Sequence, residues 1–144
     1  MGKIYATREH EIACGHRVYG HESKCAHLHG HNYKFKFYVT SKDLDTVGRV
    51  VDFSVIKSIL CEWLEKNYDH KFLLYDQDPW SLELSKLDPA GVRIVPYNPT
   101  AENIAKFLVE VVGPKELPPH LLLEKVEVWE TGKCTAIYSK EEDK

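Results

Sequence analysis

The stretch NYKFKFYV at residues 32–39 constrains the fold most, because its hydrophobic and polar side chains alternate. Phe35, Phe37 and Val39 would face one side of a β-strand, and the polar residues between them would face the other. Such alternation predicts a half-buried strand in a sheet with one covered face. Residues 3–15 mix hydrophobic and polar residues in a way that predicts an edge-like strand before it.

Two later segments have helical periodicity. Hydrophobic residues recur at helical spacing over residues 54–68, and Asp52 or Ser54 can cap the start of this helix. A second helix is predicted from Thr100, its N-cap candidate, and the pair Gly113–Pro114 is expected to end it.

The remaining segments complete an α+β pattern. Residues 76–99 carry four of the seven prolines and predict mostly irregular structure, with a short helix at SLELSKL. Residues 125–131 and 134–139 predict a closing hairpin. The order β-β-α-α-β-β, with strands and helices segregated, is typical of an α+β fold in which helices cover one face of a largely antiparallel sheet. Such a sheet has open edges, which favours a homo-oligomer.

Composition excludes several classes of protein. The 144 residues are expected to form one domain, and a net charge of −3 argues against a nucleic-acid surface that works by bulk electrostatics. The chain has no apolar run that could span a membrane and no secretory leader, so we expect a cytoplasmic protein. The four cysteines (Cys14, Cys25, Cys61 and Cys134) form no C-x-x-C pair and are expected to be reduced; Cys61 lies off the apolar stripe of its helix and receives no role.

The histidines cluster near the N-terminus, with six of the eight between residues 10 and 31. In the segment HGH, His29 and His31 would share one face of a strand and could bind a metal together. His27 would lie about 13 Å from His31 in an extended strand. His16, at the end of the preceding strand, is therefore the better candidate for a third ligand.

Cys14 opens an alternative, because it could share a face with His16. A site made of Cys14 and the three histidines would be a closed, structural site, whereas three ligands with a free fourth position are typical of a catalytic zinc. The spacing of these residues in the sequence is compatible with both the closed and the open site.

Three further sites carry reactive side chains. Cys25 follows Lys24 in a polar stretch, where a thiol of lowered pKa could act as a base or nucleophile. Asp69 next to His70 has the composition of a proton relay. Glu130 ends a strand on the side expected to be buried, where a carboxylate needs a ligand or a salt bridge.

Six segments resemble one protein family when they are taken together and in order: HRVYG, KCAHLHGHNYKFK, VVDFSVIK, YDHKFL, NPTAEN and VEVWET. They are similar to the family of 6-pyruvoyltetrahydropterin and 6-carboxytetrahydropterin synthases and cover most of the chain. The resemblance implies one such domain over residues 1–144 with the tunnelling fold (T-fold). This fold is a four-stranded antiparallel sheet with two helices on one face, assembled through sheet edges into trimers and hexamers.

The resemblance also implies roles for individual residues. His16, His29 and His31 would be ligands of Zn²⁺, with Cys25 as the catalytic thiol and Asp69 with His70 as the relay. Glu130 would hold the guanidine-like edge of a pterin through two parallel N–H bonds. Thr100 and Glu102 would lie near the substrate, often that of a neighbouring subunit. Lys24 and Arg17 are candidate phosphate contacts, with ordinary surface cations as the alternative.

The spacing C-x3-H-G-H resembles that of the carboxy-forming enzymes of this family. The implied reaction converts 7,8-dihydroneopterin triphosphate to 6-carboxy-5,6,7,8-tetrahydropterin, acetaldehyde and triphosphate, a step toward queuosine or archaeosine. The alternatives are a 6-pyruvoyltetrahydropterin synthase and a non-catalytic, zinc-stabilised binding module. Cys14 keeps the last alternative open, and the long segment 76–99 leaves the rim of the pocket undefined.

Overall fold

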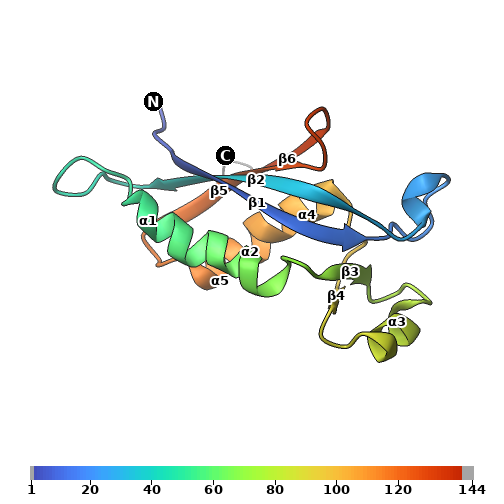
Figure 1. The fold of residues 1–144 in the computed structure, drawn as a ribbon. Coiled ribbons are helices and arrows are strands. Elements are labelled where there is room, and N and C mark those ends of the chain that lie inside the picture. Colours follow the sequence, from blue (N-terminus) through green and yellow to red (C-terminus); the bar gives the residue numbers. More distant parts are fainter. Residues whose placement is uncertain (1, 141–144) are drawn as a thin grey trace.

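The structure is a computed structural model that describes residues 2–140. Its centre is a run of four antiparallel strands in the order β1-β2-β5-β6. Strand β1 (Ala6–His16) pairs with β2 (His29–Ser41), β2 pairs with β5 (Leu121–Trp129), and β5 pairs with β6 (Thr135–Ser139). The helices lie below this sheet in Figure 1 and leave the opposite face uncovered. The predicted α+β class, with helices on one face, is confirmed.

Two short strands extend the sheet to six, so the predicted count of four was wrong. Strand β3 (Phe72–Tyr75) runs parallel to β1 and pairs with it only at Gly15 and His16, and β4 (Val92–Val95) runs parallel to β3. The short helix α3 (Ser81–Leu87), which was predicted, connects them. A run of four residues is too short to show a hydrophobic period, which is why β4 was not predicted within residues 76–99.

The first helical run covers 53–67 in three parts: α1 (Phe53–Ile56), the π-helical turn η2 (Lys57–Cys61) and α2 (Glu62–Asn67). The Asp52 carboxylate accepts the Ser54 N–H at 2.9 Å, so Asp52 is the N-cap. The π turn shifts the phase of the helix, because it holds more residues than an α turn. Cys61 is consequently 1% exposed, and its placement off the apolar stripe was wrong.

The second run covers 101–116 as α4 (Ala101–Phe107), the π-helical turn η3 (Leu108–Val112) and α5 (Gly113–Glu116). Thr100 is its N-cap, as predicted, and accepts the Asn103 N–H at 3.1 Å. The predicted end at Gly113–Pro114 was wrong, because the π turn already interrupts the regular ladder that a proline would break. Gly113 has a packing role instead: a Cβ there would lie 2.8 Å from the Cβ of Leu123.

The hydrophobic core lies between the helices and the covered face of the sheet. Phe35, Phe37 and Val39 are buried on β2, as their alternation predicted, and Ile56, Leu60 and Leu64 are buried on the first helical run. None of the described helices is both long and apolar enough to cross a membrane.

Candidate metal centre

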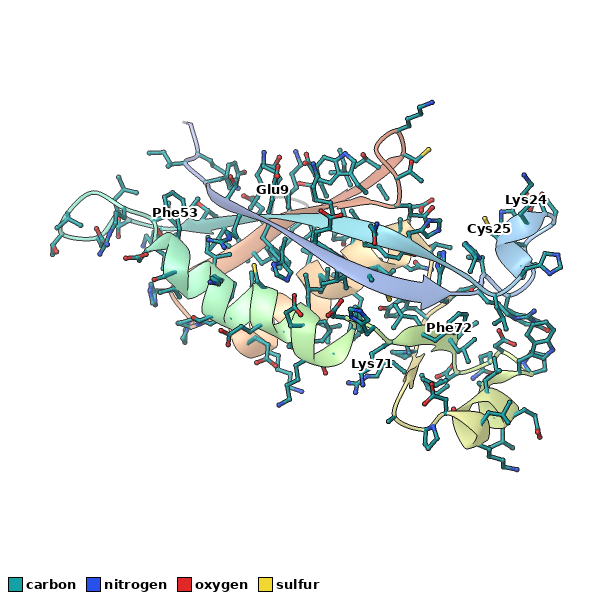
Figure 2. The ribbon with its side chains drawn as sticks, in the orientation of Figure 1. Glu9, Lys24, Cys25, Phe53, Lys71 and Phe72 are labelled. Atoms are coloured by element: carbon teal, nitrogen blue, oxygen red, sulfur yellow. The ribbon has the colours of Figure 1, made fainter. Side chains whose placement is uncertain are left out.

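Four side chains lie on the covered face of the sheet, at the end of the β1–β2 pair. His16 lies opposite His29, and Cys14 lies opposite His31. Residues directly opposite each other in an antiparallel pair share a face. Gly15 lies opposite Gly30 between them, and these two residues face the other side of the sheet. Glycine is needed at position 15, since a Cβ there would lie 2.4 Å from the ring of Phe72, which is labelled in Figure 2.

The three histidines that the sequence singled out lie together. One ring nitrogen of each of His16, His29 and His31 lies within 4.8 Å of the others. In the described part of the chain, no other group of three or more potential ligands is this close. His27 is outside the group. We call these three residues the histidine group; their role as ligands stays a prediction.

Backbone carbonyls orient two of the three rings. His16 Nδ1 lies 2.6 Å from the carbonyl oxygen of Pro99, and His29 Nδ1 lies 2.8 Å from that of His27. A carbonyl only accepts, so each Nδ1 carries the proton and each Nε2 has a free lone pair. The Nε2 atoms of His16 and His31 are buried without a hydrogen-bond partner among residues 2–140. Buried lone pairs that converge in this way fit a metal ion.

Burial also favours the neutral form of His16 and His31. It lowers the pKa of His16 to about 4, against a smaller opposite effect of the hydrogen bond to Pro99. Burial likewise lowers the pKa of His31, opposed by the nearby Glu130 carboxylate. Metal binding requires the neutral imidazole, so these rings are in the ligating form at neutral pH.

Cys14 does not join the histidine group, although it shares its face. Its Sγ is outside the group of close ligand atoms and lies 3.6 Å from the carbonyl oxygen of Gly15. Burial, and next the Asp69 charge, raise the pKa of Cys14 to about 12. The geometry therefore favours a three-histidine site over the closed four-ligand site.

Glu130 lies beside the histidine group. Its Oε1 is 3.9 Å from His16 Nε2, which agrees with the inward orientation expected from the strand pattern. The carboxylate also lines a cavity of about 250 Å³ with Glu102 from the first turn of α4 and Cys134 from the β5–β6 turn. Sequence reasoning missed Cys134, because the contact depends on the fold of that turn and not on any motif.

Cys25 lies in the short 3₁₀ helix η1 (Lys24–Ala26), in the loop that leads from β1 to His29. Figure 2 shows Cys25 and Lys24 together on this loop, at the end of the hairpin that carries the histidine group. The Cys25 side chain is partly exposed, and Lys24 is exposed. The structure therefore brings the predicted thiol to the same end of the sheet, outside the histidine group itself.

The side chains of Asp69 and His70 contact each other, as their adjacent positions in the sequence suggested. Asp69 Oδ2 lies 2.9 Å from His70 Nδ1, and Asp69 Oδ1 accepts the Ala13 N–H at 3.1 Å. Burial alone would raise the pKa of Asp69, but the hydrogen bonds from His70 and Ala13 outweigh it and lower that pKa. His70 has a left-handed φ of 57°, and its side chain is 80% exposed.

This pair lies outside the histidine group. His70 lines a cavity of about 520 Å³ whose wall includes Gly15 and Gly30 and also Cys14 and His31. Residues 13 and 15 alternate with Cys14 and His16 along β1, so they face away from the side chains of the histidine group.

Arg17 is not presented to solvent as a phosphate contact or surface cation would be. Its side chain is buried, and its Nε donates to Asp78 Oδ2 at 2.7 Å. Arg17 and Asp78 are separated by 61 positions, so no local pattern could reveal this ion pair.

The chain is similar to known proteins over most of its length. Residues 5–141 match the family model described as 6-pyruvoyl tetrahydropterin synthase. The 6-carboxy-5,6,7,8-tetrahydropterin synthase of Rickettsia bellii is 35% identical over 91% of this chain and 96% of its own length. That of Haemophilus influenzae is 34% identical over 87% of this chain and 91% of its own.

Two solved structures have the same fold. An uncharacterized protein from Wolinella succinogenes superposes with a TM-score of 0.83 at 22% identity, covering 98% of this chain and 100% of the other. The 6-pyruvoyl tetrahydropterin synthase of Caenorhabditis elegans superposes with a TM-score of 0.69 at 24% identity, covering 98% of each chain.

Proposed function

The chain belongs to the 6-pyruvoyl tetrahydropterin synthase family, and on that premise we propose that it is a zinc-dependent 6-carboxy-5,6,7,8-tetrahydropterin synthase, a lyase. The proposed reaction converts 7,8-dihydroneopterin triphosphate to 6-carboxy-5,6,7,8-tetrahydropterin, acetaldehyde and triphosphate. Its product would enter the synthesis of 7-deazaguanine nucleosides such as queuosine.

The histidine group is the observation that carries this proposal. Its nitrogens converge within 4.8 Å, and those of His16 and His31 are buried without partners among the described residues. Three imidazole ligands suit a zinc site that keeps a fourth position open for a reactant. Zn²⁺ held there would act as a Lewis acid that makes the side-chain hydroxyls of the substrate, and the adjoining C–H, more acidic.

Glu130 is the proposed anchor for the pterin. A carboxylate can accept two parallel N–H bonds from the guanidine-like edge of the ring. Its position 3.9 Å from His16 Nε2 would place the ring in the adjoining cavity and its side chain toward the histidine group. Glu102 lines the same cavity, and Thr100 begins the helix that carries it.

Proton transfer is assigned to two groups. We propose that the Cys25 thiolate removes a proton from the substrate side chain, and that exposed Lys24 contacts the triphosphate. His70 would transfer a proton at the opposite face of the substrate. Asp69 would hold His70 Nδ1 protonated, which leaves Nε2 to exchange the proton.

The position of His70 supports a homo-oligomer, in which the relay serves the site of a neighbouring chain. His70 is not among the close ligand atoms of its own histidine group, and its side chain is 80% exposed. Two sheet edges are also open within residues 2–140: β6 pairs only with β5, and the outer side of β1 pairs only at Gly15 and His16. Pairing of these edges between chains would give the trimer-based assembly, a hexamer in its full form, that we propose.

Two other functions would use the same residues. A 6-pyruvoyltetrahydropterin synthase would eliminate triphosphate without cleaving the side chain, and the C-x3-H-G-H spacing favours the carboxy-forming reaction over it. A non-catalytic zinc-stabilised module would need a closed site, which is disfavoured because the Cys14 Sγ is outside the group of close ligand atoms.

Product analysis tests the proposal. Zinc-loaded protein is incubated with 7,8-dihydroneopterin triphosphate, and the products are identified by mass spectrometry. We expect a 6-carboxy pterin with acetaldehyde from the native chain, and no turnover but full zinc content from Cys25→Ala. A 6-pyruvoyl product would keep the site and refute the carboxy-forming reaction. No turnover, with one tightly held zinc per chain, would indicate a binding module.

A further inference from the structure

Arg17 directly follows the predicted ligand His16, and its buried side chain contacts Asp78, Trp80 and Ala26, of which Trp80 is itself 43% exposed. The Nε of Arg17 donates to Asp78 Oδ2 at 2.7 Å, and both side chains are nearly inaccessible, with exposures of 9% and 0%. Its guanidinium carbon lies 3.5 Å from the ring centre of Trp80. Its Nη1 donates to the carbonyl oxygen of Ala26 at 3.0 Å. One side chain thus joins the end of β1, the 78–80 turn and the loop that contains Cys25.

The 78–80 turn is itself held in place by Asp78. While Oδ2 of Asp78 accepts from Arg17, its Oδ1 accepts the Trp80 N–H at 2.9 Å. Both carboxylate oxygens are therefore engaged, and Trp80 is fixed where its ring faces the guanidinium. Arginine suits this position because a planar guanidinium can stack on a ring while it donates sideways to two acceptors, which a lysine cannot do.

Apart from two hydrogen bonds between Tyr19 and Asn98, at 3.1 and 2.8 Å, the Cys25 loop has few attachments to distant parts of the chain. The η1 helix has three residues, none of them buried, and its N-cap Ser23 makes no side-chain capping bond. The peptide of Cys25 is attached through the Val18 N–H, which donates to the Cys25 carbonyl at 2.8 Å. The contact from Arg17 to Ala26 lies one residue further on. Both attachments start from Arg17 and its neighbour, so the position of the loop depends on that of Arg17.

We propose that Arg17, Asp78 and Trp80 form a clamp by which the segment 76–99 positions the Cys25 loop next to the histidine group. Arg17 is then a positioning residue and not a contact of the substrate phosphates. The inference rests on the proposed function in one respect, namely that Cys25 is the catalytic thiol. A shift of about 1 Å in a reacting group can lower a rate by two orders of magnitude, so a loosened loop would lower kcat.

The test compares Arg17→Lys with the native, zinc-loaded chain. Hydrogen exchange at the amides of residues 18–27 should become at least tenfold faster, while amides in the centre of β2 keep their native rates. Zinc content and KM should stay unchanged, and kcat should fall at least tenfold. Trp80→Phe, which keeps a ring for stacking, should give a smaller change in both exchange and kcat.

Arg49→Lys is the matched control, because Arg49 also forms an ion pair, with Asp45 at 2.9 Å, but is half-exposed and lies in another loop. It should leave exchange in 18–27 and kcat unchanged. If Arg17→Lys does not fold, Asp78→Asn tests the same clamp, since the amide keeps an acceptor for the Trp80 N–H and loses the charge that faces Arg17.

The outcomes separate the clamp from the proposed reaction. A lower kcat with native exchange in 18–27 would overturn the clamp and make Arg17 a substrate contact. Faster exchange throughout β2 as well would overturn it in favour of a general structural role. Faster exchange confined to 18–27, in a protein whose native form does not turn over the pterin, would support the clamp and refute the reaction.

Discussion

Nδ1 of His16 lies 2.6 Å from the carbonyl oxygen of Pro99, the residue before the N-cap of α4. This hydrogen bond joins the end of β1 to the start of the helix that carries Glu102. It also selects the ring nitrogen that stays free. The candidate ligand and the rim of the proposed pterin cavity are therefore oriented by the same contact.

Replacing a proposed ligand should remove zinc. His29→Ala should lower zinc affinity more than about 100-fold, because even outer-shell partners of a metal ligand contribute 10–100-fold. The control is His27→Ala, since only the backbone carbonyl of His27 contacts the group. Metal analysis after chelation and reconstitution would measure both, and equal zinc in the two variants would contradict the assignment.

The free energy of unfolding of the metal-free protein should decrease as the pH is lowered from 6.5 toward 4. The pKa of His16 is lowered from 6.5 to about 4 in the folded state, mainly by burial. The stabilisation from keeping this ring neutral is therefore complete above pH 6.5 and is lost as the pH falls from 6.5 toward 4. It amounts to about 2 kcal/mol between pH 6.5 and 5, at roughly 1.4 kcal/mol per pKa unit. Urea unfolding across this range measures it; His16→Gln should flatten the curve, and a native curve that is already flat would contradict the burial argument.

Tyr33→Phe should stabilise the metal-free protein by about 1 kcal/mol, because it removes a buried hydroxyl without a partner. The Tyr33 hydroxyl has no hydrogen bond within the described residues, and the residue is 1% exposed. Tyr68 is equally buried, but its hydroxyl lies 2.5 Å from that of Tyr97. Tyr68→Phe should therefore destabilise by a similar amount, and the free energies of unfolding of the two variants should move in opposite directions.

Alkylation should separate the four cysteines. The raised pKa of Cys14, about 12 instead of 9.0, lowers its thiolate fraction about a thousandfold. Burial also raises the pKa of Cys61. Iodoacetamide at pH 7.5 should thus label exposed Cys134 and partly exposed Cys25 and leave buried Cys14 and Cys61 intact in the folded chain. Rapid labelling of Cys14 in the metal-free protein would revive the closed-site interpretation.

Glu130→Gln should weaken pterin binding. Loss of the charged acceptor should raise the Kd for the pterin about 10- to 100-fold, the usual cost of a hydrogen bond to a charged group. Glu127→Gln is the control from β5, the strand that ends just before Glu130; the Glu127 carboxylate accepts from the Tyr38 hydroxyl at 2.9 Å on the uncovered face. Fluorescence titration with a pterin would compare the two, and equal affinities would exclude Glu130 as the anchor.

Local sequence patterns correctly predicted the structural features that depend on residues close together in the chain. The caps at Asp52 and Thr100 and the buried face of β2 all follow from residues a few positions apart. The histidine group was also predictable, because strand alternation joins His29 to His31 and the expected end of the preceding strand placed His16 nearby.

Features that depend on distant contacts were not predictable. The ion pair of Arg17 with Asp78 joins residues 61 positions apart. The burial of Cys61 follows from a π turn, which leaves no mark in the spacing of hydrophobic residues. From the sequence, Gly113 was predicted to end a helix. In the structure, glycine is required there because the backbone approaches Leu123 closely.

The pairing of His16 with His29 has a consequence for folding. A slip of one residue between β1 and β2 would turn one member of each pair to the opposite face. The histidine group therefore exists only in chains whose first two strands have paired in the native register. A metal ion that needs all three rings would discriminate against misaligned hairpins, so its uptake would serve as a proofreading step in the maturation of the protein.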